Sequence, residues 1–360
     1  MRAAMSTKIS RDDVIAGYRL LLKRDPENET VIQVHLGLGT WWKFVSVLMD
    51  SEEYKLAHAT TKQATAATQI YAGYSAQDLE LFKHFTPYRG PGADGFVIDF
   101  LGVRTRTTFS AGFSELNGQV LGYPIPMDFH AETIEWIGLL KSIMSATGSV
   151  SVLELGAGWG PWLSAAAAAA RAKQIGNVRL YGVEADAGHI EFMREHFAAN
   201  DIGGDMYEII PAVVGPEAGR CYWPVTPEAA ADYGQSAFMF QYAEAYKGRF
   251  PGFLEVDVVG INEILGKEKR WDLVHMDIQG SETEVCTAGI AELTRRVRWL
   301  VIGTHSRKIE GDLLELFVKA GWILEHEKPT RFAFDALQPA LTAMTTFDGA
   351  QVWRNDQASW

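Results

Sequence analysis

The sequence predicts an α/β fold with a doubly wound, mostly parallel sheet, preceded by a smaller all-α domain. From about residue 148, apolar runs of strand length alternate with helical stretches, which is typical of a parallel sheet covered on both faces. The first sixty residues instead space their apolar side chains as helices do. A chain of 360 residues exceeds one typical domain, and an apolar fraction of 47% is enough to build ordered cores.

The helical N-terminal module is predicted over residues 1–87. Val14, Tyr18 and Leu22 share one helical face, a turn at residues 25–28 ends that helix, and a further helix begins near Ser51. This stretch resembles a small helical module found beside bacterial surface proteins and glycan-modifying enzymes, through Tyr18 and residues 21–27, 39–42 and 51–54. The resemblance implies docking or a homo-oligomer contact; a plain helical cap on the next domain is the alternative.

Residues 88–147 are expected to form a linker and a β-rich or helical lead-in. Residues 62–87 contain an Ala/Gln/Thr-rich helix and an amphipathic one around Phe82. Residues 88–95 are dense in glycine and proline and mark the linker. Residues 96–109 then alternate loosely, as strands do.

The main domain is predicted over residues 148–360. Its expected elements are strands over 150–155, 178–183, 207–214, 271–276, 299–302 and 322–326, and helices over 162–172, 187–198, 282–293 and 312–320. The six consecutive alanines at 165–170 are strong helix formers. Their small side chains would let that helix lie close to the sheet.

A glycine-rich turn at the end of the first of these strands is the strongest local signal. Gly156, Gly158 and Gly160 let the backbone turn tightly and let a ligand approach main-chain atoms. The next strand ends at Glu184, where a carboxylate can accept hydrogen bonds from a ribose diol. A dinucleotide fingerprint does not fit, because its third glycine would fall on Pro161 or Leu163.

The frame from Glu154 to Gly160 resembles the S-adenosylmethionine (SAM) loop of class I methyltransferases. The resemblance implies that SAM is held by Glu184 together with the loop residues Glu154, Gly156, Ala157, Gly158 and Gly160. It also implies that the segment after the third strand, with Ala212 and Val213, walls the adenine.

Polar residues end the next two strands. Asp277 and Gln279 follow the strand over 271–276, and His305 follows the strand over 299–302. Side chains at these ends face the ligand cleft of an open α/β sheet. His305 can take a proton near neutral pH, and His275 shares the face of Asp277. Glu282 is either part of this site or a cap at the N-terminus of a helix.

These residues resemble the FkbM family of SAM-dependent O-methyltransferases. Asp277, Gly280, Glu282 and His305 match its pattern, as do residues 233–236 and 256–265, so that the likeness covers about residues 125–355. It implies a seven-stranded sheet whose last strand, near 349–354, is antiparallel. It also implies that Asp277, His305 and Glu282 orient or deprotonate an acceptor hydroxyl, with Asp277 also close to SAM.

Two departures from the family pattern matter. Glu154 stands where aspartate is usual, and Ile278-Gln279 replaces the commoner Val-Glu, which removes a carboxylate. A bound divalent metal is therefore not favoured, since Asp277, Glu282, His275 and His305 are the only ligand types nearby.

The acceptor is expected to be a hydroxyl of a sugar or of a glycan-containing small molecule. Trp159, Trp162 and Trp223 lie in or near the predicted site, and aromatic faces stack on sugar rings as well as packing in cores. His130, Glu132 and Glu135 either line the acceptor side or cap a helix. A NAD-dependent sugar oxidoreductase and a non-catalytic SAM-binding scaffold remain as alternatives.

Composition sets further expectations. The net charge of −12 and the pI near 5.3 argue against a nucleic-acid partner. Neither a membrane span nor a cleaved signal is recognisable. Two cysteines, Cys221 and Cys286, are too few for a disulfide framework. The expected location is the cytoplasm.

Overall fold

The computed structural model describes residues 8–22, 24–51, 53–54, 73–237, 251–337 and 344–357. The chain divides into two compact units, residues 1–70 and 71–360. The domain boundaries predicted at residues 88 and 148 stay predictions. Most of the Ala/Gln/Thr-rich helix expected after residue 62 lies outside the described residues, as does Glu52.

Within its described residues, the first unit contains three capped α-helices: α1 (Arg11–Gly17), α2 (Glu29–Leu36) and α3 (Trp41–Asp50). Each begins after a side chain that accepts a hydrogen bond from a first-turn amide, namely Ser10, Asn28 and Thr40. A π-helical turn, η1 (Tyr18–Leu22), continues α1. The helices bury a small core of their own: Ile9, Val14, Tyr18, Leu22, Ile32, Phe44, Val45 and Leu48.

The lead-in to the main sheet is mostly turns and short elements. A 3₁₀-helix, η2 (Asp78–His84), stands where an amphipathic helix is predicted, and it buries Phe82. The strands β1 (Phe96–Ile98) and β2 (Arg104–Arg106) pair antiparallel, and η3 (Ala111–Leu116) and α5 (Thr133–Ser145) follow. The α5 helix packs its buried face against the main sheet.

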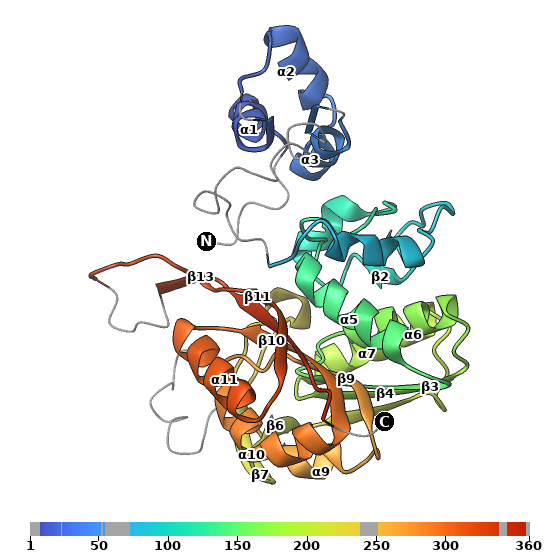
Figure 1. Cartoon of the computed structure of the whole chain (residues 1–360), viewed down its shortest axis with the longest axis vertical. Helices are drawn as coiled ribbons and strands as arrows, with labels where there is room; N and C mark the ends of the chain where they lie inside the picture. The colour runs from blue at the N-terminus through green and yellow to red at the C-terminus, as the bar shows by residue number, and fades with distance from the viewer. Residues whose placement is uncertain are drawn as a thin grey trace. The chain divides into compact units, whose positions relative to one another are not determined.

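The main sheet has seven strands in the order β11-β14-β10-β9-β3-β4-β5, which confirms the predicted fold class (Figure 1). Five neighbouring strands pair in parallel: β3 (Ser149–Leu155), β4 (Asn177–Glu184), β5 (Tyr207–Pro211), β9 (Trp271–Met276) and β10 (Val297–Thr304). The last strand, β14 (Gly349–Arg354), runs antiparallel between β10 and β11 (Ile323–Lys328).

Helices cover both faces of this sheet. On one face α5, α6 (Pro161–Ala172) and α7 (Ala187–Ala199) enclose one core, and on the other α9 (Ile261–Leu265), α10 (Glu282–Arg296) and α11 (Arg307–Lys319) enclose another. Figure 1 shows α5, α6 and α7 on the opposite side of β3 and β4 from α9 and α10. Five of the six consecutive alanines of α6 are buried, as their small size suggests.

The strand predicted over 207–214 is wrong in one respect: the chain leaves the main sheet at Ala212. The Ala212 amide donates to the carbonyls of Glu184 and Ile210, and the next residues, β6 (Val213–Gly215), join a second sheet with β8 (Phe253–Gly260) and β7 (Gly219–Pro224). The structure also has the short elements η4 (Ala229–Ala231), β12 (Arg331–Phe332) and β13 (Thr345–Phe347). Within the described ranges, every helix is too short or too polar to span a bilayer.

Candidate functional site

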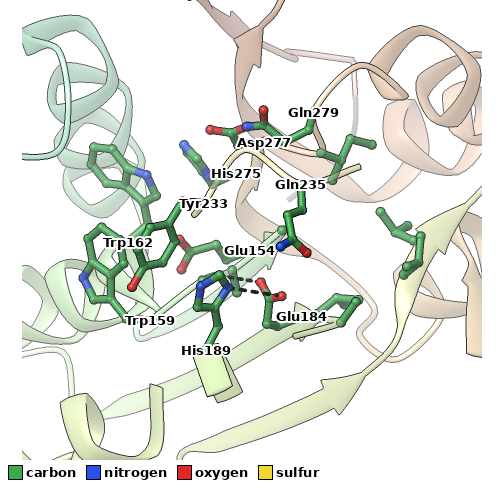
Figure 2. Close-up of a pocket in the computed structure, with 18 of the residues that line it drawn as sticks. Glu154, Trp159, Trp162, Glu184, His189, Tyr233, Gln235, His275, Asp277 and Gln279 are labelled. Carbon is green, nitrogen blue, oxygen red and sulfur yellow. Dashed lines mark hydrogen bonds and ion pairs between the residues drawn. The ribbon is translucent and has the colours of Figure 1, made fainter. Parts of the chain in front are cut away.

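A cavity opens at the carboxyl ends of β3, β4 and β9, where the parallel strands deliver their last side chains to one edge. Figure 2 shows Glu154, Glu184, His275 and Asp277 converging on it from these strands, with Tyr233 and Gln235 from a loop. The sequence therefore places most of its predicted site residues around one cavity, including Gly156, Ala157, Gly158, Ala212 and Val213.

The glycine loop needs its glycines for two reasons. Gly156 has φ +74°, and a Cβ there would lie 1.9 Å from the carbonyl oxygen of Asp277. Gly158 has φ +53°, which side chains rarely adopt. Gly160 is the left-handed N-cap of α6. The loop is thus tightly folded against the end of β9, and its three glycines add no side chains of their own.

Glu184 ties the glycine loop to β4. Its Oε2 accepts a 2.7 Å hydrogen bond from the Gly158 amide, and its Oε1 accepts a 2.7 Å bond from the Asp186 amide. His189 Nδ1 lies 3.7 Å from the same Oε1. The carboxylate is only 6% exposed, so its orientation at the cavity wall is fixed.

Glu154 is buried at the start of α6. Its Oε2 accepts a hydrogen bond of 3.1 Å from the Leu163 amide, which satisfies a free amide in the first turn of the helix. Burial raises the pKa of Glu154 well above its usual value. The structure therefore gives this residue a helix-capping contact in addition to its place in the cavity wall.

Asp277, His305 and Glu282 form a charged group beside the cavity. His305 Nε2 lies 3.2 Å from Asp277 Oδ1, and His305 Nδ1 lies 3.0 Å from Glu282 Oε1. Burial lowers the pKa of His305, but the two neighbouring carboxylates outweigh burial and raise it to about 11. Burial likewise opposes ionisation of Asp277, yet contact with His305 holds its pKa below the usual value.

The orienting and deprotonating roles predicted for His305 both stay predictions. Its contacts with two carboxylates raise its pKa, which supports the orienting role. Glu282 is fully buried and accepts hydrogen bonds from the amides of Ile278 and Gly280. It holds the turn after β9 and does not face the cavity.

Asp277, Glu282 and His305 are also the one group of potential metal ligands in the part of the chain that the structure describes. The carboxylate of Glu282 already accepts hydrogen bonds from backbone amides and contacts His305. Asp277 Oδ1 faces both His305 and the Gln279 amide group, which donates at 2.7 Å. Whether a metal binds stays a prediction from the sequence.

Tyr233 and His189 are among the cavity-wall residues that the sequence did not assign to the site. The Tyr233 hydroxyl donates to the Phe109 carbonyl oxygen at 2.7 Å, and the Tyr233 ring stacks on His189 at a centroid distance of 4.2 Å. The turn at residues 233–236 gave a signal for Tyr233. His189 had none, because it is an ordinary residue in the first turn of α7.

Of the residues predicted near the acceptor, all but Glu132 line the cavity. His130, Glu135, Trp159, Trp162 and Trp223 line the cavity. Glu132 is instead the N-cap of α5, where it shares a capping box with Glu135 and pairs with Lys328.

Comparison with known proteins gives one close relative. No family model matches the chain. A protein of Jannaschia sp. (strain CCS1), named as a methyltransferase, is 32% identical over 276 residues, which are 76% of this chain and 97% of the relative.

Solved structures with a similar fold share little sequence. They include precorrin-6y C5,15-methyltransferase from Geobacter metallireducens GS-15 (11% identity, 62% of this chain and 89% of that chain, TM-score 0.35). Methyltransferase FkbM from Methylobacillus flagellatus KT matches at 12% identity, over 94% of this chain and 58% of that chain, with a TM-score of 0.34. A protein of Pyrococcus horikoshii described as an RNA methyltransferase matches at 10%, over 63% and 86%, with a TM-score of 0.33.

The predicted exclusion of a nucleic-acid partner is withdrawn; proteins described as RNA or tRNA methyltransferases are among the structures of similar fold. The exclusion was drawn from net charge, which sums over the whole chain and does not describe the surface beside a cavity. The alternative of an oxidoreductase also lacks support, because the relative that covers three quarters of this chain is named as a methyltransferase. The chain belongs to the methyltransferase family of the Jannaschia protein.

Proposed function

We propose that this protein transfers the methyl group of SAM to a hydroxyl of a sugar or of a glycan-containing small molecule, as an FkbM-like O-methyltransferase. The observation that carries the proposal is the junction of the glycine loop with Glu184. It combines a glycine-rich stretch of main chain with a carboxylate fixed at the tip of the neighbouring strand.

The residues at this junction suit the donor. Each oxygen of Glu184 accepts one backbone hydrogen bond, and a carboxylate oxygen can accept a further one, so the group can receive both hydroxyls of a ribose. Ala212 and Val213 offer an apolar wall beside it for the adenine. Two polar atoms of the wall, Trp223 Nε1 and Gln235 Oε1, are buried without a hydrogen-bond partner, as expected of groups that await a ligand.

When bound, SAM supplies a methyl group activated by its sulfonium. The work left to the chain is alignment, which supplies most of the rate gain in a displacement of this kind. Glu282 and His305 hold Asp277 at the edge of the cavity. Both side-chain contacts of Asp277 engage Oδ1, so Oδ2 is placed to accept a hydrogen bond from the acceptor hydroxyl and to orient it.

Aromatic side chains support a sugar ring as the acceptor. Trp159 and Tyr233 meet edge to face at 4.9 Å beside the cavity, and Trp223 lines the same cavity. Such rings offer an apolar face with polar edges nearby, which suits a hydroxylated ring. The position that is methylated is left to experiment.

Two measurements test the proposal. Calorimetry should show that SAM binds the wild type and binds Glu184→Ala at least tenfold more weakly, because a charge-assisted pair of hydrogen bonds is lost. Glu191→Ala is the matched control, since Glu191 is exposed on α7 and pairs only with Arg194 among its described contacts. Equal affinity for wild type and Glu184→Ala would remove the ribose assignment.

The second measurement is transfer of tritium from methyl-labelled SAM to a panel of neutral glycosides and small alcohols. Label in a glycoside product supports O-methylation of a sugar. SAM binding without transfer to any member of the panel would support the scaffold alternative instead.

A further inference from the structure

One end of the cavity is lined by polar side chains that lie away from the glycine loop and Glu184. His275 lies there on β9, only 4% exposed, and neither of its ring nitrogens has a hydrogen-bond partner. Buried polar groups are almost always paired, so an imidazole with two unpaired nitrogens in a cavity wall calls for a ligand.

Neighbouring side chains hold this imidazole in place. The Trp162 ring packs on it at a centroid distance of 5.0 Å and an interplanar angle of 32°. Glu135 Oε1 lies 3.5 Å from His275 Nε2, while Glu135 Oε2 accepts a 2.9 Å hydrogen bond from the Glu132 amide. Glu135 is therefore anchored at the N-terminus of α5 through one oxygen and presents the other to the cavity.

The order of the strands sets the distance between the His275 end of the cavity and the proposed ribose site at Glu184. The sheet runs β9-β3-β4-β5, and the apolar wall at Ala212 follows β5, Glu184 ends β4, the glycine loop follows β3 and His275 is on β9. Neighbouring strands lie about 4.8 Å apart, so β9 is about 10 Å from β4. That is about the distance from the ribose hydroxyls of SAM, across the sulfur, to the carboxylate of its amino-acid head in an extended conformer.

The charges at this end match that head. It carries a carboxylate and an ammonium group, and buried charges need partners. An imidazole N–H can donate to the carboxylate, and the free oxygen of Glu135 can accept from the ammonium group. Among the described residues that line the cavity there is neither a lysine nor an arginine, so the ordinary cationic partner of a carboxylate is missing from this wall.

We propose that His275 and Glu135 bind the amino-acid head of the methyl donor, His275 through its carboxylate and Glu135 through its ammonium group. This inference rests on the proposed function. It assigns Glu135 to the donor, where the sequence left open an acceptor-side or a helix-capping role. Trp162 is then a positioning residue that fixes the plane of the imidazole.

A pair of ligands tests the proposal without an acceptor. S-adenosylhomocysteine and 5′-deoxy-5′-methylthioadenosine share the adenosine and a neutral sulfur, but only the first carries the amino-acid head. Calorimetry with both ligands on His275→Phe and Glu135→Gln should show ten- to hundredfold weaker binding of S-adenosylhomocysteine, because hydrogen bonds to a charged group are lost. Binding of methylthioadenosine should stay within twofold of the wild type.

The other outcomes are decisive. Glu184→Gln is the control for the opposite end and should weaken both ligands by a similar factor. If both head variants leave S-adenosylhomocysteine unaffected, or weaken both ligands equally, the proposal is overturned. Failure of the wild type to bind either ligand would instead refute the proposed function. Glu135→Gln keeps the shape of the side chain and its bond to the Glu132 amide, so it serves as the test if His275→Phe does not fold.

Discussion

The close approach of the glycine loop to the end of β9 predicts a large effect of one methyl group. In Gly156→Ala the new Cβ would start 1.9 Å from the Asp277 carbonyl oxygen, whereas real Cβ atoms essentially never come within 3.0 Å of such an atom. Two backbone segments must therefore separate by more than 1 Å. This shift strains the hydrogen bonds from the Asp277 amide to Leu155 and from the Gly156 amide to Val183.

Gly148→Ala is the matched control. Gly148 has φ +77°, almost the same as Gly156 at +74°, but nothing lies within 4 Å of its Cβ position. The left-handed conformation alone costs about 1–2 kcal/mol, and a less flexible unfolded chain offsets about 0.4–1 kcal/mol of that. We expect Gly148→Ala to lower the free energy of unfolding by about 1 kcal/mol.

Gly156→Ala carries the same strain and also weakens two backbone hydrogen bonds, at about 1 kcal/mol each. We therefore expect a loss of about 3 kcal/mol, together with loss of SAM binding. Urea denaturation followed by circular dichroism gives both free energies, provided that the slope with denaturant is unchanged. If the two variants differ by less than about 1 kcal/mol, the loop and β9 are not in the contact that the structure describes.

Three further predictions follow from buried groups. The pKa of His305 is raised from 6.5 to about 11 on folding, so its contribution to stability is complete below pH 6.5 and is lost as the pH rises toward 11. His305→Gln should therefore flatten the fall in the free energy of unfolding above pH 7. For one proton this fall is at most about 1.4 kcal/mol per pH unit. Because burial raises the pKa of Glu154, Glu154→Gln should be at least as stable as the wild type at pH 8 and gain less at pH 4.5, in urea titrations at the two pH values. Leu273→Ala removes a side chain that is 1% exposed in the core between α5 and the sheet. The cavity it leaves should lower the free energy of unfolding by about 2–5 kcal/mol. A smaller loss in the same urea titration would mean that this core is loosely packed.

The amino-acid sequence by itself determined the main sheet and the place of the glycine-rich turn. Apolar runs such as Trp271–Met276 mark strands buried on both faces, and the period of the pattern needs no tertiary information. The glycines at 156, 158 and 160 follow a strand and precede a helix, so their place at the edge of the sheet could be predicted. The helix boundaries were less certain, because caps such as Ser306 extend α11 beyond the apolar pattern.

Only the tertiary structure decided which polar residues contact one another at the cavity and which do not. His305 and His275 each lie close to the end of a strand, yet their surroundings differ. His305 has a carboxylate oxygen within 3.2 Å of each ring nitrogen, whereas Glu135 comes only to 3.5 Å from Nε2 of His275. That difference arises from α5 and from the turn before α10, which bring Glu135 and Glu282 to within 3.5 and 3.0 Å of the two rings. The charge of a histidine, and which of its ring nitrogens are free to bind a ligand, depend on neighbours that are distant in the chain. Its role therefore cannot be predicted from its place in a strand.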